Sequence, residues 1–336
     1  MSEQIKNPAP AQAAASPLLE VSGLKTYFPI KKGLLGRAVG YVKAVDDVSF
    51  TVGRCETLGV VGESGCGKST MGRSVLRLIE PTEGKVLFDG TDVRALSPAD
   101  LRSFRKRMQI IFQDPLSSLD PRYTIDRTLA EPLKLHTNLS DAEIHEKVLD
   151  LMAQVGLPAF HAAKFPHEFS GGQRQRIGIA RAISMNPEFI VCDEPVSALD
   201  VSIQSQVLNL LRELQQKMHL SYLFISHDLS VVKYISDRIA VMYLGHIVEL
   251  AESEELFAHR LHPYTQALTS AIPIPDPHLQ QHRIVLQGNV PNPADPPKGC
   301  PFHERCEHCM EICKTEKPQF KEVCPGHFVS CHLYSK

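Results

Sequence analysis

The chain has 336 residues, of which 43% are hydrophobic and 22% charged, a balance that is ordinary for a soluble globular protein with a sizeable core. Its length favours two domains, or one large domain with an appendage. The formal net charge of -2 and the pI near 6.7 give no electrostatic reason to expect nucleic-acid binding.

The first residues, MSEQIKNPAPAQAAASP, predict a short disordered tail over 1–17. They lack the basic region and apolar core of a secretory signal, and no stretch approaches the roughly 20 apolar residues of a membrane span. We therefore expect a cytosolic chain. Thiols stay reduced in the cytosol, so clustered cysteines there favour metal binding over disulfides.

Strands are predicted in LLEVSGLKTYF, YVKAVDDVSFTV and TLGVVG, all within residues 18–62. The last is almost wholly apolar, which is typical of a buried central strand. A helix is predicted in GKSTMGRSVLRLI and a further strand in GKVLFDG. The stretch of about 114–182 is mostly helical in pattern.

Strand character returns at 187–195, 221–228 and 238–250. Between the first two, QVLNLLRELQQKM carries apolar residues on one helical face. This alternation predicts an α/β fold around a largely parallel sheet. After about residue 272 the sequence becomes Pro-rich, which predicts a linker and a small separate C-terminal module.

GESGCGKST, at Gly62–Thr70, matches G-x-x-x-x-G-K-[ST] between a buried strand and a helix. Its glycines allow backbone N–H groups to surround phosphates at a helix N-terminus. Lys68 supplies charge to the outer phosphates, and Ser69 is placed to bind Mg²⁺. The predicted nucleotide contacts are Gly62, Ser64, Gly65, Cys66, Gly67, Lys68, Ser69 and Thr70.

FIVCDEP predicts the second half of this site, because its apolar run places Asp193 at the end of a buried strand. There the carboxylate reaches the Mg²⁺ shell. Glu194 follows directly and is predicted to polarise the attacking water.

FSGGQRQRIGIARAI begins at Phe169 and predicts a second phosphate-seeking helix N-terminus. Its contacts are Ser170, Gly171, Gly172 and Gln173. Since one nucleotide needs a single cradle, the second is predicted to act on nucleotide held by a partner subunit.

These motifs, in this order, resemble those of the ATP-binding-cassette (ABC) ATPases over roughly residues 18–257. The resemblance implies a RecA-like P-loop core with an antiparallel β subdomain and an α-helical subdomain. The signature begins with Phe169 where the family has Leu, a conservative departure.

The resemblance also carries roles for single residues. Gln113 in IIFQDP matches the loop that senses Mg²⁺ and contacts the membrane subunit. Asp200 ends SALD, which matches the loop across the dimer interface. His227 matches the switch histidine at the γ-phosphate. Phe28, or Tyr27 beside it, lies where the family stacks an aromatic ring on adenine.

The implied mechanism is head-to-tail closure of two cassettes around ATP, reset by hydrolysis through Glu194 and His227, with Lys68 and Gln113 completing the catalytic set. Separate membrane subunits would receive the motion beside Gln113. A DNA-repair ABC protein would need a long insertion, an ABC translation factor a second cassette, and a kinase or GTPase would lack SGGQ.

HPYTQAL and NPADPPKGCPFHERC narrow the resemblance to ATPases of dipeptide/oligopeptide importers, most closely the second, F-type subunit. They lie in a predicted extension, 258–336. The implied partners are a homologous ATPase, two membrane permeases and an extracytoplasmic peptide-binding protein, with the chain peripheral on the cytoplasmic face of the inner membrane. A nickel- or glutathione-type importer is an alternative, and an exporter ATPase is the nearest rival.

Six of the nine cysteines follow residue 299. Cys306 and Cys309 form one close pair with Cys313 four residues on, so the spacing permits zinc without demanding it. The dipeptide-importer resemblance instead implies a [4Fe–4S] cluster, with ligands Cys300, Cys306, Cys313 and Cys331. Cys309 or Cys324 could replace one of these, and zinc or no metal remain alternatives.

Overall fold

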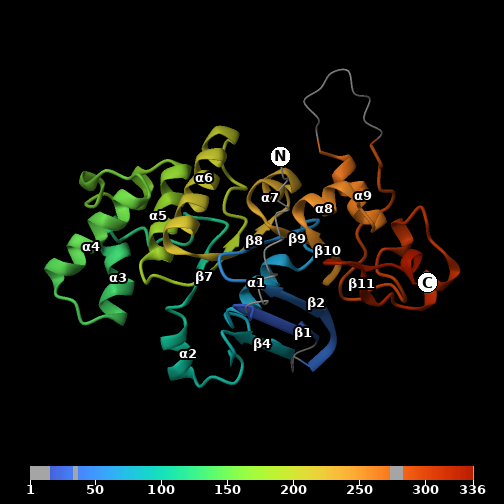
Figure 1. Cartoon of the computed structure of the whole chain (residues 1–336). Coiled ribbons are helices and arrows are strands. Elements are labelled where there is room, and N and C mark those ends of the chain that lie inside the picture. Colours follow the sequence, from blue (N-terminus) through green and yellow to red (C-terminus); the bar gives the residue numbers. More distant parts are fainter. Residues whose placement is uncertain (1–15, 33–36, 273–282, 336) are drawn as a thin grey trace, which may run out of the picture.

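The computed structural model describes residues 16–32, 37–272 and 283–335, with many apolar side chains buried around one long sheet (Figure 1). The predicted tail therefore lies almost wholly outside the described residues, as does the first part of the Pro-rich linker. Within the described ranges, no helix combines the length and apolar character that crossing a bilayer requires.

Five parallel strands lie side by side at one end of the eight-stranded sheet, beginning with its edge strand. In spatial order they are β6 (Met108–Ile111), β7 (Phe189–Asp193), β8 (Ser221–Ser226), β3 (Thr57–Val61) and β9 (Arg238–Tyr243). Every residue of β3, β7 and β8 is buried, as expected for parallel strands covered on both faces. The parallel α/β core is thus confirmed.

Successive residues of one strand face opposite cores. On β7, Ile190 and Cys192 pack with helix α6 (Val201–Met218), whereas Val191 packs with α1 (Lys68–Val75). The short helix α7 (Leu229–Ile235) joins α6 on the first face. Because β3, β7 and β8 are covered on both faces, a ligand can approach them from the loops at their ends.

A second, four-stranded antiparallel sheet covers α1. Its order is β2 (Arg37–Val52), β1 (Leu19–Lys32), β4 (Glu83–Phe88) and β5 (Thr91–Asp92). Helix α2 (Pro98–Phe104) follows it in the chain. This sheet carries Tyr27 and Phe28 on β1.

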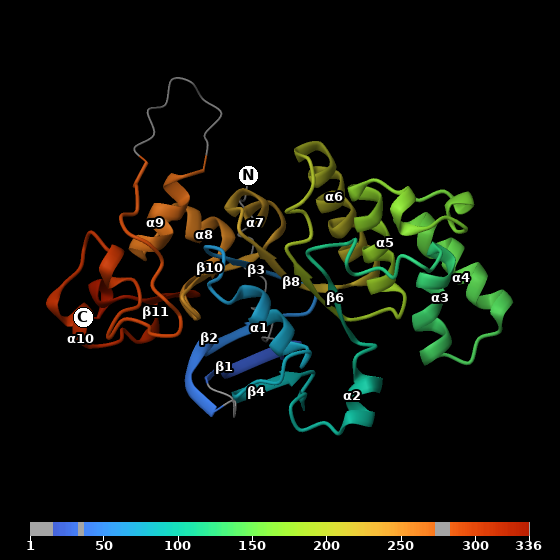
Figure 2. The ribbon, with the colours of Figure 1, turned by 180° about the vertical axis from the view of Figure 1, so that it is seen from behind.

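The predicted helical stretch forms a group at one end of the central sheet (Figure 2). It contains α3 (Ile125–His136), α4 (Asp141–Gln154) and α5 (Gly171–Ile183), with the 3₁₀ turns η1 (Ala159–His161) and η2 (Pro166–Glu168). Ser140 and Glu143 form a capping box at the start of α4, which satisfies backbone groups there.

The strand character predicted over 238–250 is confirmed, but it belongs to two strands, because the chain reverses at Leu244 and Gly245. These residues have φ of 44° and 82° and join β9 to the antiparallel β10 (His246–Glu252). Two left-handed residues make the tight turn typical of hairpins. The sequence pattern did not reveal this turn, because the apolar run continues through it.

The residues after β10 lie at the end of the sheet opposite the helical group (Figures 1 and 2). They comprise α8 (Ser253–Ala258), α9 (Pro263–Ser270), η3 (His303–Arg305), α10 (Glu311–Thr315), β11 (Phe320–Cys324), β12 (His327–Ser330) and η4 (His332–Tyr334). Strand β12 pairs with β10, and β11 with β12, so these strands continue the central sheet.

Candidate functional site

The loop between β3 and α1 is held in a conformation that glycine favours. Gly65 and Gly67 have φ of 81° and 103°, and a Cβ on Gly67 would lie 1.9 Å from the Ala44 carbonyl oxygen. Lys68 is buried, and its ammonium donates hydrogen bonds to the carbonyls of Gly62 (2.8 Å) and Glu63 (3.1 Å). The loop thus encloses one positive charge at the start of α1.

Ser69 and Asp193 are 124 residues apart in sequence and in direct contact in the fold. The Ser69 hydroxyl donates to Asp193 Oδ1 at 2.6 Å, and the carboxylate is fully buried at the end of β7. Arg73 Nη2 lies 3.1 Å from Asp193 Oδ2. A hydroxyl and a carboxylate are hard oxygen donors, so the pair fits Mg²⁺.

Glu194 is held at the next position by a left-handed backbone, with φ of 46° and its N–H bonded to the Ile225 carbonyl. Its Oε2 accepts a hydrogen bond from Gln113 Nε2 at 3.0 Å and lies 3.2 Å from His227 Nδ1. The ends of β6, β7 and β8 thus bring together three residues of the predicted catalytic set. Parallel strands place their carboxyl ends at one edge, and sites in open α/β sheets form there.

The second predicted cradle is elsewhere in the chain. Ser170 caps α5 and forms a capping box with Gln173 (Ser170 N–H to Gln173 Oε1, 3.1 Å). Figure 1 shows α5 beside α6, away from α1. Gly172 packs closely, since a Cβ there would lie 2.4 Å from Ile203 Cγ2. Asp200 is exposed at the N-terminus of α6.

The two aromatic residues on β1, Tyr27 and Phe28, lie in different environments. The Tyr27 hydroxyl is hydrogen-bonded to Asp46, and burial with this bond raises the pKa of Tyr27. Lys43 Nζ lies 5.6 Å from the centre of its ring. Phe28 makes no such polar bond through its side chain and is 40% exposed. Phe28 is therefore the ring with more surface open to a stacked base.

The arrangement of the C-terminal cysteines differs from the predicted metal site. Cys300 and Cys313 are buried, and the Cys300 N–H bonds to the Cys313 carbonyl at 2.8 Å. Burial raises the pKa of Cys300 to about 12, and Cys313, Cys331 and Cys306 add to this shift. The four predicted ligands are thus neighbours. Nevertheless, the described part of the chain contains no group of three or more His, Cys, Asp or Glu side chains arranged to hold a metal ion, so the structure does not support the predicted cluster or a zinc site.

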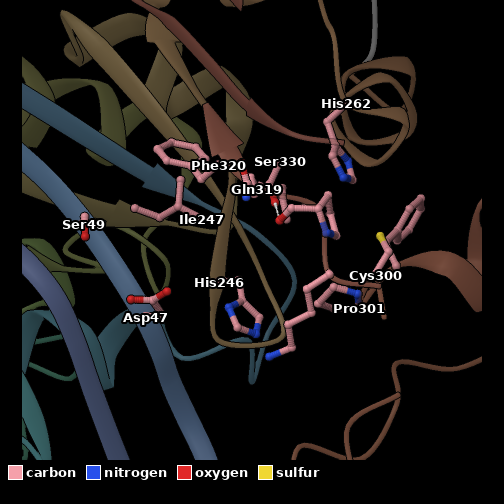
Figure 3. A pocket seen from close by; sticks show the side chains of 14 residues that line it. Asp47, Ser49, His246, Ile247, His262, Cys300, Pro301, Gln319, Phe320 and Ser330 are labelled. Atoms are coloured by element: carbon pink, nitrogen blue, oxygen red, sulfur yellow. Dashed lines mark hydrogen bonds between the residues drawn. The ribbon is translucent and has the colours of Figure 1, made fainter. Parts of the chain in front are cut away.

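A cavity of about 560 Å³ separates this segment from strand β2. Figure 3 shows Cys300 and His262 on one side of it and Asp47 and Ser49 on the other. None of the predicted nucleotide contacts lines this cavity. It is therefore distinct from the site at the strand ends.

A glycine-rich loop, a hydroxyl–carboxylate pair and a Glu–Gln–His group at one sheet edge define a P-loop nucleotide hydrolase. The family model described as ABC transporter matches residues 45–197, and that described as Oligopeptide/dipeptide transporter, C-terminal region, matches 248–313. The oligopeptide transport ATP-binding protein AppF of Bacillus subtilis is 57% identical over 95% of this chain and 98% of its own. A peptide import ATP-binding protein of Brucella ovis is 54% identical over 94% of this chain and 98% of its own.

Among solved structures, the dimeric post-hydrolysis state of the ATP-binding cassette MJ0796 bound to ADP and Pi has a TM-score of 0.63 at 26% identity, over 70% of this chain and 98% of that one. CbiO1 from Clostridium perfringens has a TM-score of 0.62 at 25% identity, over 73% and 92%. This chain therefore belongs to the ABC transporter ATP-binding proteins with an oligopeptide/dipeptide-type C-terminal region.

Three residues at the phosphate-binding loop were not predicted. Glu63 lies inside the loop motif at a variable position, and its side chain meets Arg305 while its N–H meets Tyr264. Arg305 is 242 positions away in sequence. No local spacing relates such residues, so only the fold could identify them.

Proposed function

We propose that this chain is the ATP-binding and ATP-hydrolysing subunit of an ABC importer for di- or oligopeptides. The observation that carries the proposal is the convergence of Gln113, Glu194 and His227 beside the Ser69–Asp193 pair. Within it, residues 18–257 act as the cassette, with a helical subdomain near 114–182, and 258–336 as the extension.

The chemistry follows from the positions of the chain's own groups. Backbone N–H groups of the loop and the Lys68 ammonium bind the outer phosphates. Glu194 orients the attacking water and accepts its proton, while Gln113 and His227 hold the carboxylate in place through Oε2. When bound, Mg²⁺ neutralises charge on the phosphates, and Ser69 and Asp193 are the residues that would hold it.

The second cradle supports a dimeric mechanism. Figure 1 shows α5, which Ser170 caps, apart from α1, where the phosphate-binding loop ends, and Asp200 is exposed at the N-terminus of the adjacent helix α6. We infer that this surface closes on ATP held by a second, homologous ATPase subunit. The similar MJ0796 cassette is described as dimeric in its post-hydrolysis state.

The transported substrate is inferred from the relatives. The match over 248–313 to the oligopeptide/dipeptide C-terminal region and the names of the relatives favour peptides. Permease subunits, fed by an extracytoplasmic peptide-binding protein, would then anchor the chain at the cytoplasmic face of the membrane. Nickel-type, glutathione-type and export functions are the alternatives.

A transport assay tests this proposal. Cells whose own copy is replaced by the wild type or by Glu194→Gln are supplied separately with radiolabelled dipeptides, oligopeptides, glutathione and nickel. We expect peptide uptake that is lost in the variant. Loss of nickel or glutathione uptake alone would identify the alternative importer, and retention of all uptake would overturn the import function.

The cysteine-rich segment carries a separate proposal, that Cys300, Cys306, Cys313 and Cys331 bind a [4Fe–4S] cluster. Their proximity supports it, while the lack of a ligand-like arrangement counts against it. Anaerobic purification with assays for iron, sulfide and zinc tests it, using Cys313→Ser against Cys55→Ser, an exposed cysteine outside the segment, as the control. A colourless, metal-free, active wild type would overturn the proposal, and zinc alone would replace it.

A further inference from the structure

Residues of the C-terminal extension contact the phosphate-binding loop at Glu63. The guanidinium of Arg305 donates to both carboxylate oxygens of Glu63, at 2.7 Å from Nη1 and 3.0 Å from Nη2. Only 7% of the Arg305 side chain is exposed. A bidentate pair of this kind restrains both position and orientation.

The backbone of the same residue is held independently. The Glu63 N–H donates to the hydroxyl of Tyr264 at 2.9 Å. Tyr264 is fully buried in helix α9, and its ring packs edge-on against Tyr243 with centroids 4.8 Å apart. Phe302 closes the aromatic cluster, at 5.2 Å from Tyr243 and 5.4 Å from Tyr264. The hydroxyl that holds the loop thus sits on a packed support.

Glu63 is coupled in turn to Lys68. Its carbonyl accepts a hydrogen bond from the Lys68 ammonium at 3.1 Å and another from the Cys66 N–H at 3.3 Å. A movement of Glu63 therefore moves the acceptor that places the lysine. An unpaired Glu63 carboxylate would also oppose ATP, because two negative groups repel across a few ångströms.

We infer that Arg305 and Tyr264 of the C-terminal extension are positioning residues for the phosphate-binding loop, and that they raise its affinity for ATP. The inference rests on the proposed function only in that the loop binds nucleotide. Arg305 ends η3 and directly precedes Cys306. The Arg305 side chain thereby links the conformation of the cysteine-rich segment to the nucleotide site.

A double-mutant cycle on the full chain tests the link, with the affinity for MgATPγS measured by calorimetry. Arg305→Gln should weaken binding about tenfold in the wild-type background, since truncating one member of a buried charge pair leaves the other uncompensated. In the Glu63→Gln background the same change should alter affinity by less than about twofold. The KM for ATP should rise while kcat at saturation stays nearly constant.

Two further variants keep the outcome clear. Arg260→Gln is the matched control and should bind like the wild type. Among the residues that the structure describes, the side chain of this arginine of the extension bonds only to the Phe257 carbonyl. Tyr264→Phe keeps the ring and removes the hydroxyl, so it should weaken binding about threefold even if Arg305→Gln folds poorly.

Equal effects of Arg305→Gln in both backgrounds, or no effect in either, would overturn the inference while leaving ATP binding intact. A wild-type chain that binds no MgATPγS would instead refute the proposed function itself.

Discussion

Two regions of the central sheet hold charged groups in opposite ways. At the carboxyl ends of β7 and β8, Glu194 and His227 meet on loops, and half of the His227 side chain is exposed. Between β10 and β12, the side chains of Glu249 and His327 are fully buried, 2.8 Å apart. Residues that follow the carboxyl ends of parallel strands stay accessible, whereas Glu249 and His327 lie within the strands β10 and β12, where both side chains are buried.

The two regions therefore serve different purposes: the Glu249–His327 pair anchors the extension, and Glu194 is placed to react. The carboxylate of Glu249 is satisfied three times, by the N–H groups of Leu261 and His262 and by His327. That pattern fastens the extension to the sheet, and full burial keeps the Glu249 carboxylate away from solvent. Glu194 is held by two side chains and stays near the surface, where it can act on a ligand. Substitutions at each region should therefore be measured for both activity and stability.

The largest expected effect is on catalysis. Glu194→Gln should lower kcat by about 10²–10⁴-fold, because the amide cannot accept the proton of the attacking water. Steady-state phosphate release gives kcat, and calorimetry should show MgATPγS binding unchanged. Glu213→Gln, on the exposed face of α6, is the matched control. A near-normal kcat in Glu194→Gln would remove this residue from the catalytic role and erase the contrast between the two regions.

Glycine substitutions sharpen the account of the loop. Gly67→Ala places a Cβ against the Ala44 carbonyl, so the loop must shift and ATP affinity should fall by at least about tenfold. Gly65→Ala meets no atom within 4 Å and carries only the cost of its positive φ. It should bind more tightly than Gly67→Ala. The reverse order would show that the close approach at Gly67 does not shape the cradle.

A substitution in the Glu249–His327 pair should lower the free energy of unfolding. His327→Leu leaves the buried Glu249 carboxylate without its partner and should cost about 3 kcal/mol of unfolding free energy. Urea unfolding followed by circular dichroism measures this cost, with kcat at saturating ATP as the second readout. A loss of kcat without a loss of stability would contradict the assignment of this pair to anchoring.

The same pair predicts a pH dependence. Burial alone would lower the pKa of His327, but the hydrogen bond and charge of Glu249, aided by Glu255, outweigh burial and raise it. The stabilisation is complete below about pH 6.5, the unfolded value, and is lost as pH rises through the folded pKa. Neighbouring His262 has the opposite sign, because burial lowers its pKa to about 4. Its contribution is present above about pH 6.5 and is lost as pH falls toward 4.

Urea midpoints from pH 5 to 8 separate the two histidines. Removing His327 should make the remaining stability rise more steeply with pH, and His262→Gln should make it fall more steeply. Identical slopes in the two variants would contradict both signs.

The smallest effect is expected far from both regions. Ser140→Ala removes the cap whose hydroxyl accepts from the Glu143 N–H, and should cost about 1 kcal/mol. It should leave kcat and ATP affinity unchanged. An effect on kcat larger than that of His327→Leu would show that the helical group, rather than the sheet edge, controls the chemistry.

Much of the fold and of the candidate site could be predicted because the signals are local. The buried strands β3, β7 and β8 are short apolar runs, and the residues at their ends follow from where those runs stop. Arg73 was missed although it lies one helical turn after Ser69, since its partner Asp193 is on another strand. The convergence of Gln113, Glu194 and His227 remained an expectation from the family resemblance until the fold placed them in contact.

By itself, the sequence determined the alternation of buried strands and helices and the phosphate-binding motif. Those features depend on residue type and spacing, which act over a few positions. Only the tertiary structure decided that β12 pairs with β10, that His327 is buried against Glu249, and that Arg305 reaches Glu63. Such contacts depend on how the whole chain packs, because each joins residues separated by 70 positions or more.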